Sequence, residues 1–163
     1  MENKAQIIGQ IFVFILAGLI FVLIIAYGYK AVTNFIEKGE QVSIIEIKND
    51  FETASYEMKR QYGSVRKLQL RVPSKFDGMC VVDVNNCPSH VVLPAESGDM
   101  SVDWIVDACN VKSANVFSVP RTVELFLPDI IVDAPNYVCV PNVGNTVTFK
   151  LEGTGRAVKV SAW

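Results

Sequence analysis

The N-terminal part of this chain has almost no charge. No Asp, Glu, Lys or Arg occurs in the 25 residues from Ala5 to Tyr29, and most of these residues are aliphatic or aromatic. A helix of that length spans about 37 Å at ~1.5 Å per residue, against ~30 Å for the hydrocarbon core of a bilayer. Because a helix in a soluble core is seldom so long without a charge, we predict a transmembrane helix over residues 6–29, with membrane lipid as its partner.

Several sequence signatures of chemistry are also missing. The formal net charge is −2 and no cluster of basic residues stands out, which argues against nucleic acid as a partner. The chain has neither a Gly-rich phosphate loop nor a GxSxG nucleophile elbow, and its carboxylates are scattered. We therefore expect no cofactor, no catalytic residue and no enzyme activity.

Histidine and cysteine are scarce, with one His and four Cys. All four cysteines follow the apolar tract, which is typical of disulfides in an oxidising compartment. Cys80 and Cys139 lie in short apolar segments, whereas Cys87 and Cys109 lie near expected loop or helix ends. Four cysteines allow three pairings, and this placement favours Cys80–Cys139 with Cys87–Cys109. The alternative is a zinc site with Cys87, His90 and two further cysteines as ligands; we expect disulfides and no metal.

The position of the cysteines also bears on membrane topology. The residues on both sides of the apolar tract carry charges of both signs, so the positive-inside rule decides little. Disulfides form outside the cytoplasm. We therefore predict a single-pass cell-membrane protein whose N-terminus is cytoplasmic and whose C-terminal domain is extracytoplasmic.

A helical pattern continues beyond the apolar tract. Apolar residues recur there at spacings of three and four: Ile44, Ile47, Phe51, Ala54, Met58 and Tyr62. Gly63 follows the last of them, as a glycine after a helix C-terminus does, and Gly39 is a point where the helix could kink or break. We predict an amphipathic helical stalk over residues 30–62 that packs on the following domain.

From Gly63 onward the hydrophobic period changes to two residues, which is typical of strands. The expected strands lie in KLQLRVPS, MCVVDV, HVVLP, NVFSV, TVELFLPDIIVD, YVCVP, TVTFKLEG and RAVKVSAW. Glycines in NVGN and EGTGR predict hairpin turns between the last three, whereas SVDWIVDACN fits a short helix capped by Ser101 or Asp103 only ambiguously. We predict an α+β fold, with a long transmembrane helix that continues onto a mainly antiparallel β-sheet domain, residues 63–163.

The stretch NKAQIIGQ, which leads into the apolar tract, bears on processing. A secretory signal peptide has an apolar region of ~7–15 residues and a small-x-small cleavage site. Here the apolar run is longer, and only Ala26-Tyr27-Gly28 at its end is a passable site. Cleavage there would release the domain, but the helical pattern continues through this point. We therefore keep a secreted domain as the less favoured alternative.

The sequence NKAQIIGQIFVFI resembles the class III signal peptides of type IV pilin-like proteins, particularly archaeal pilins and archaellins. The resemblance implies a leader of residues 1–5, with Lys4 and Ala5 before the scissile bond and Gln6 at the start of the mature chain. A prepilin-peptidase-like protease would be a partner. Ala5 replaces the commoner glycine, and Gln10 stands at the fifth mature position, where many pilins carry a glutamate that neutralises a neighbouring N-terminal amine.

The composition of the apolar helix also favours association. Gln10 is a polar amide that prefers a protein partner within a bilayer, and Gly9 and Gly18 permit close approach of another helix. Gln6 can equally lie at the headgroup level. We therefore expect self-association, or association with other pilin-like subunits, through the N-terminal helix.

Together these features favour a structural pilin-like subunit of a type IV pilus-like surface filament or of its assembly apparatus. The alternative is a single-pass, membrane-anchored binding or accessory module that keeps its N-terminus and does not polymerise. A third hypothesis, with less support, is an extracytoplasmic metal-binding or hydrolytic domain.

Overall fold

The computed structural model describes residues 3–95 and 98–163, with side chains described except those of residues 3–11, 34–38, 40 and 41. The chain divides into two compact units, Met1–Gln41 and Val42–Trp163. In the described residues, the elements are two helices and ten short strands. The strands are β1 (Val65–Arg71), β2 (Gly78–Val82), β3 (Val92–Leu93), β4 (Met100–Ser101), β5 (Val116–Val119), β6 (Glu124–Leu125), β7 (Ile130–Val132), β8 (Tyr137–Pro141), β9 (Thr146–Gly153) and β10 (Val158–Ala162).

Helix α1, Asn3–Lys59, begins in the first unit and ends in the second. Its assigned helix includes Gly39, so the possible break there does not occur. The helix ends three residues before the predicted limit of the stalk. Gly63 follows with a φ of 73°, a left-handed conformation that favours glycine, and its N–H donates to the carbonyl of Gly153 over 2.8 Å.

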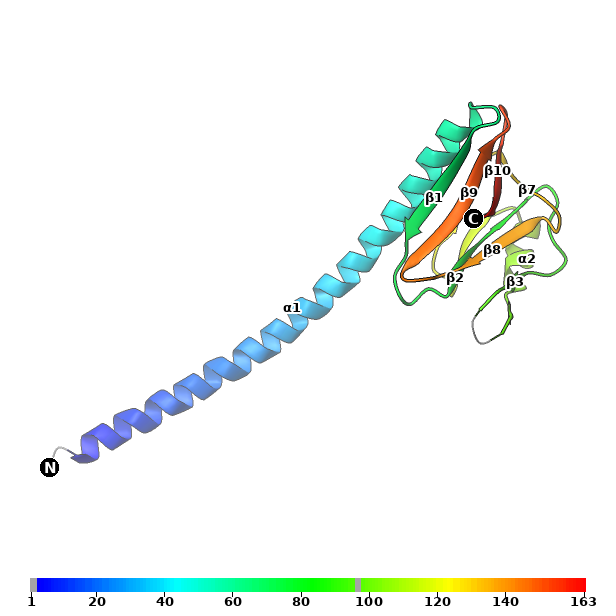
Figure 1. Ribbon diagram of the computed structural model, residues 1–163. Helices are drawn as coiled ribbons and strands as arrows, with labels where there is room; N and C mark the ends of the chain where they lie inside the picture. Colours follow the sequence, from blue (N-terminus) through cyan, green and yellow to red (C-terminus); the bar gives the residue numbers. More distant parts are fainter. Residues whose placement is uncertain (1–2, 96–97) are drawn as a thin grey trace. The chain divides into compact units, whose positions relative to one another are not determined.

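The strands of the second unit form two four-stranded sheets and a small pair. The first sheet has the order β1-β9-β10-β7, and the second has the order β6-β5-β2-β8. All pairings are antiparallel except β10 with β7, which is parallel. Figure 1 shows β1, β9 and β10 side by side, with β2 and β8 as the neighbouring layer. The short pair β3 and β4 is antiparallel.

Strand β2 lies between two hydrophobic clusters, and all five of its residues are buried. Met79 and Val81 face the first cluster, whereas Cys80 and Val82 belong to the second. The first cluster also contains residues of α1 and of the first sheet: Ile47, Phe51, Ala54, Met58, Leu68, Leu70, Ile130, Val132, Val147, Phe149, Leu151, Val158 and Val160. A strand covered on both faces needs a continuous apolar run rather than alternation, and MCVV supplies it.

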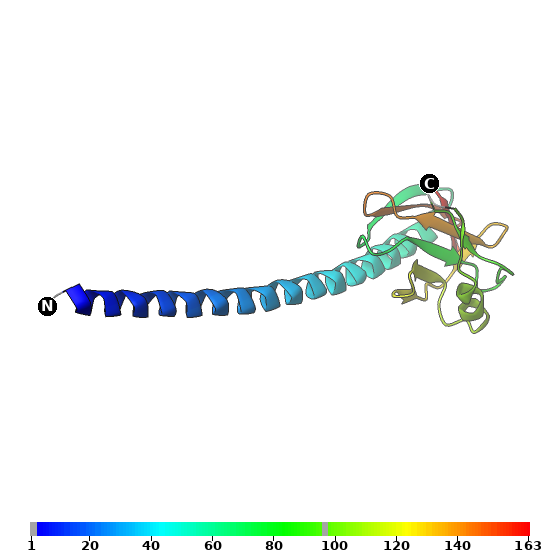
Figure 2. The ribbon, with the colours of Figure 1, turned by 90° about the horizontal axis from the view of Figure 1, so that it is seen from below.

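Helix α2, Trp104–Asn110, contributes to the second cluster together with Cys80 and Val82 of β2, and Figures 1 and 2 show the domain that contains it from two sides. Its buried residues include Ile105 and Cys109, which join the second cluster. The structure thus resolves the ambiguity of SVDWIVDACN in favour of a helix. Asp103 occupies the N-cap position, but its helical φ and ψ of −62° and −17° keep its carboxylate from capping the backbone.

The predicted mixture of helix and mainly antiparallel sheet is confirmed. One connection differs from the expectation of consecutive hairpins. Strands β9 and β10 do form an antiparallel pair, but β8 and β9 lie in different sheets. The turn between them, with Gly144 at φ 60° and Asn145 at φ 61°, carries the chain from one sheet to the other. The physical reason is that β8 pairs with β2, whereas the alternating β9 pairs with β1.

Candidate functional site

The first unit contains a long apolar segment on the surface of the chain. Phe12–Thr33 is a 22-residue stretch with a mean hydropathy of 2.6 and no buried residue. A segment of this length and composition is suited to a membrane anchor or a signal sequence. The Thr33 hydroxyl donates to the carbonyls of Tyr29 and Lys30 over 3.2 and 3.0 Å, so the helix itself satisfies this polar group.

The predicted processing and assembly residues lie on α1. The backbone of Lys4, Ala5, Gln6, Gly9 and Gln10 is helical. Their side chains lie outside the described residues, so their predicted roles stay predictions. Gly18 is described: a Cβ placed there would have nothing within 4 Å. Its position is therefore open on this chain, as close approach of a second helix requires.

The last turns of α1 carry buried residues in the second unit. The rings of Phe51 and Phe149 have centroids 5.7 Å apart with a 54° interplanar angle, and both side chains are fully buried. At the end of the helix, a Cβ on Gly153 would lie 2.2 Å from the Met58 carbonyl oxygen and 2.0 Å from that of Gln61. Only a residue without a side chain fits between β9 and these carbonyls.

All four cysteines are bonded in two disulfides, and none is free. The bridges are Cys80–Cys139 and Cys87–Cys109, the two pairs that strand placement favours. Cys80 and Cys139 face each other directly in the register of β2 and β8. The second bridge ties the loop after β2 to α2. With every thiol consumed, no cysteine can serve as a thiolate zinc ligand in this state.

His90, the remaining residue of the zinc hypothesis, has a carboxylate partner. Its Nδ1 lies 2.6 Å from Oδ1 of Asp103, which also accepts the Val91 N–H over 3.1 Å, while the Ser101 hydroxyl donates to Oδ2 over 2.8 Å. The Ser101 hydrogen bond, followed by those from Val91 and His90, lowers the pKa of Asp103 below its ordinary value. Among the residues that the structure describes, no group of three His, Cys, Asp or Glu side chains could hold a metal ion.

The outward face of the first sheet is polar, as the alternation in β9 predicts. Lys159 Nζ lies 2.6 Å from Asp133 Oδ2, and this hydrogen bond raises the pKa of Lys159. Thr146, Thr148 and Lys150 are half-buried, in contrast to the buried side chains between them. These contacts make a solvated sheet surface and bring no reactive pair together.

Sequence reasoning missed a cavity of about 380 Å³ in the second unit. It lies between the last turns of α1 and the connection from β6 to β7, which are far apart in the sequence. No periodicity in the sequence signals it, because Tyr56 and Phe126 read there as ordinary residues of a helix and of a strand.

No family model matches the chain, and the comparisons with curated proteins and with solved structures likewise found no match.

Proposed function

We propose that the chain is a structural, pilin-like subunit that is anchored by its N-terminal helix and assembles through it. In this proposal residues 6–29 cross the membrane once, residues 1–5 are removed, and the C-terminal domain is extracytoplasmic. One observation carries the proposal: a single assigned helix, Asn3–Lys59, contains both the exposed apolar segment and buried residues of the β-rich unit.

The first supporting argument concerns what covers the apolar segment. Twenty-two residues with side chains such as Phe12, Phe14 and Phe21 exposed must be shielded from water by lipid or by other helices. Within a bilayer, small residues at a helix surface permit van der Waals packing of a second helix. Gly18, which is open on this chain, provides such a position, and Gln10 would add an interhelical hydrogen bond.

A second argument concerns how the anchor joins the domain. We propose that the amphipathic part of α1 packs on the first sheet, supported by the buried Phe51–Phe149 contact and by the close approach of Gly153 to the helix end. The same assigned helix would then supply both the anchor and part of the core of the domain.

The third argument concerns the compartment. Two disulfides consume all four cysteines of the domain. Reducing conditions in the cytoplasm disfavour such bonds. This supports placing the domain outside the cytoplasm and the short head, with its cleavage site, inside.

The N-terminus of the protein isolated from native membranes tests this proposal most directly. We expect intact-mass and N-terminal peptide mass spectrometry to find Gln6 as the first residue. Ala5→Leu should block processing, because a large side chain replaces the small residue before the scissile bond. Ala5→Gly is the matched control and should be processed as well as the unmodified chain or better.

Other N-termini lead to other functions. A chain that begins at Tyr29 would contradict every membrane-anchored form of the proposal. An intact Met1 in the membrane fraction would favour the anchored accessory module over the pilin-like subunit.

Assembly is tested separately from processing. Gly18→Leu should lower the fraction of processed protein that sediments as filaments, because the added side chain keeps neighbouring helices apart. Leu19→Ile retains the size of its side chain and serves as the control. Filaments of unchanged abundance in Gly18→Leu would exclude this face of the helix from assembly.

A further inference from the structure

The cavity between α1 and the β6–β7 connection has features of a ligand site that the anchoring proposal does not use. Its volume of about 380 Å³ lies in the range of small-molecule sites. Two aromatic residues at its edge are exposed, Tyr56 at 61 % and Phe126 at 50 %. Polar groups also line it, from Glu52, Ser55, Lys59 and Asp129. Aromatic and polar groups thus converge on one hollow from two separate segments.

The Ser55 hydroxyl is the least expected of these groups. Ser55 is only 7 % exposed, and its Oγ is buried with no hydrogen-bond partner in the described part of the chain. A buried polar group without a partner lowers stability, so such groups are uncommon in native proteins. Ser55 lines the cavity, so a rotation of its side chain would bring the hydroxyl to a ligand there, and a hydrogen bond to that ligand would remove this cost.

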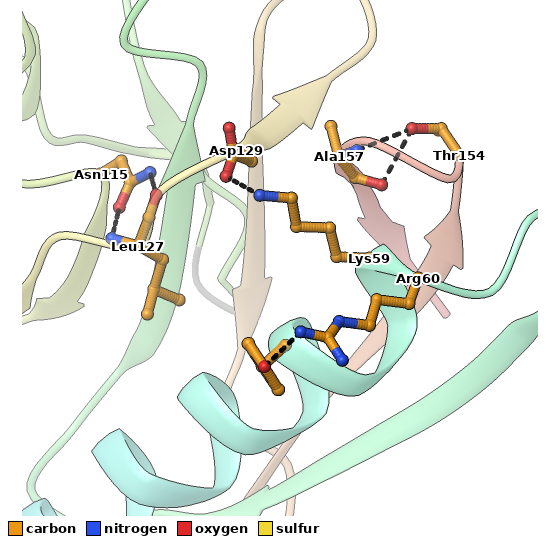
Figure 3. A network of polar contacts seen from close by, with 8 residues as sticks. Lys59, Arg60, Asn115, Leu127, Asp129, Thr154 and Ala157 are labelled. Carbon is orange, nitrogen blue, oxygen red and sulfur yellow. Dashed lines mark hydrogen bonds and ion pairs between the residues drawn. The ribbon is translucent and has the colours of Figure 1, made fainter.

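The loop that forms one wall of the cavity is fixed by hydrogen bonds and an ion pair to the rest of the domain. The Asn115 side chain, which is fully buried, accepts a hydrogen bond from the Leu127 N–H over 2.8 Å and donates to the Leu127 carbonyl over 2.7 Å. Asp129 is fixed on both sides: its carbonyl accepts the Val158 N–H over 2.8 Å, and its carboxylate pairs with Lys59. Figure 3 shows the Asn115 side chain hydrogen-bonded to Leu127, and the Lys59 side chain extending from the helix to pair with Asp129. The wall that presents Phe126 is therefore preorganised.

The helix side of the cavity is held as well. The Arg60 guanidinium lies 4.7 Å from the centroid of the Tyr56 ring, and its Nη2 donates to the Tyr56 hydroxyl over 2.5 Å. These contacts restrict the orientation of an otherwise exposed ring. An aromatic ring with restricted freedom loses little entropy when a ligand binds.

The charges in the cavity select against an ionic ligand. Lys59 is paired with Asp129, and Glu52 lies 3.8 Å from Lys48, so neither an anion nor a cation finds an unpaired opposite charge. A wholly apolar ligand would leave the Ser55 hydroxyl without a partner and would remove the charged side chains from water, which is unfavourable. The fitting ligand is neutral, with an apolar face for an aromatic ring and several hydroxyl groups for the polar side chains.

We propose that this cavity binds a pyranose ring of a neutral carbohydrate. The C–H face of the sugar lies against Tyr56 or Phe126, and its hydroxyl groups hydrogen-bond to Ser55, Glu52 and Asp129. The carboxylates accept from sugar hydroxyls, whereas the Ser55 hydroxyl donates or accepts. This inference does not depend on leader cleavage or on filament formation.

Saturation-transfer NMR on the full chain tests this inference. The protein is held in dodecylphosphocholine micelles, because alkyl glucoside and maltoside detergents would occupy the proposed site. Irradiation in the aromatic region saturates the rings without saturating the detergent chains. The probes are methyl α-glucopyranoside, methyl α-mannopyranoside, methyl β-galactopyranoside and N-acetylglucosamine. We expect transfer to ring C–H protons of at least one of them, and absence of transfer to all four overturns the proposal.

Variants locate the binding. Phe126→Ala and Tyr56→Ala remove exposed rings, and at least one of them should weaken binding about tenfold. Tyr62→Ala is the matched control, because Tyr62 is 86 % exposed and lies outside the cavity; it should leave binding unchanged. If both cavity variants bind the sugar as tightly as the unmodified protein, the site is elsewhere and the proposal is wrong.

Ser55→Ala separates binding from folding. It should bind the sugar more weakly although it folds at least as stably, since it removes a buried hydroxyl that has no protein partner. Circular dichroism melts on the same samples measure the stability. Unchanged sugar affinity in this variant would remove Ser55 from the site and contradict the proposed hydrogen bond.

Discussion

Gly153 lies so close to Gln61 that a Cβ on Gly153 would be 2.0 Å from the Gln61 carbonyl oxygen. Strand β9 and the residues after α1 meet there backbone to backbone, and the Gly153 N–H also donates to the Ser64 carbonyl over 3.0 Å. We therefore expect Gly153→Ala to destabilise the domain by about 3 kcal/mol, as overpacking against rigid backbone does. Urea denaturation of the full chain in detergent micelles measures the change.

The matched control for this substitution is Gly144→Ala. Gly144 has nothing within 4 Å, but its φ of 60° disfavours a side chain. Its loss should be about 1 kcal/mol, from backbone strain alone. Equal losses at the two positions would show that contact with the helix end contributes little.

Asn115 should be the most sensitive polar residue of the second unit. Its side chain satisfies both backbone groups of Leu127 in a buried environment. Asn115→Ala leaves a buried N–H and a buried carbonyl unpaired, and we expect a loss of about 3 kcal/mol. Asn49→Ala, at an exposed helix position, is the control and should change the unfolding free energy by less than about 0.5 kcal/mol. A similar small effect at Asn115 would mean that the loop is not held by this side chain.

The two disulfides should differ in their contribution to stability. The Cys80–Cys139 bridge closes a sequence separation of 59, and the Cys87–Cys109 bridge closes one of 22. Loop entropy in the unfolded chain predicts losses of about 4 and about 3 kcal/mol for the respective double alanine variants. Denaturant unfolding under non-reducing conditions measures both losses.

Thiol titration of the unmodified denatured protein should find no free thiol, and two or more free thiols would contradict the pairing.

Asp103 should make the stability fall at acid pH. Hydrogen bonds from Ser101 and Val91 lower its pKa in the folded protein relative to the unfolded chain. Its contribution is therefore fully present above the unfolded-state pKa and is lost as the pH falls through the lower folded-state pKa. Carbon-detected NMR titration should give Asp103 a pKa below 3.8. Ser101→Ala should move it upward, and a pKa that does not respond would remove the Ser101 hydroxyl as the main cause.

Local periodicity predicted the elements whose burial repeats regularly. The spacing of Ile47, Phe51, Ala54 and Met58 predicts one helix face, and all four are buried. The apolar run around Cys80 similarly predicts a strand, and the structure buries all five residues of β2. In both cases the information lies in adjacent residues, so it can be read without knowing the fold.

Pairing between distant segments could not be predicted in the same way. Nothing in the local pattern of β10 indicates a parallel partner in β7, because the alternation of Val158 and Val160 fits either direction.

The cavity could not be predicted from local patterns either. Ser55 reads as a neutral position on a helix, and only the fold places it beside Phe126. Asp103 was a plausible N-cap, yet its backbone conformation directs the carboxylate to other partners.

The parallel pairing of β10 with β7 has a consequence for the order of folding. β7 is joined to the first sheet only through β10, which follows it in the chain by more than twenty residues and is itself flanked by β9. Until Val158–Ala162 has been synthesised, β7 has no neighbour in that sheet and β9 keeps an open edge. The domain therefore reaches its native topology late, after nearly all of its residues have become available for pairing.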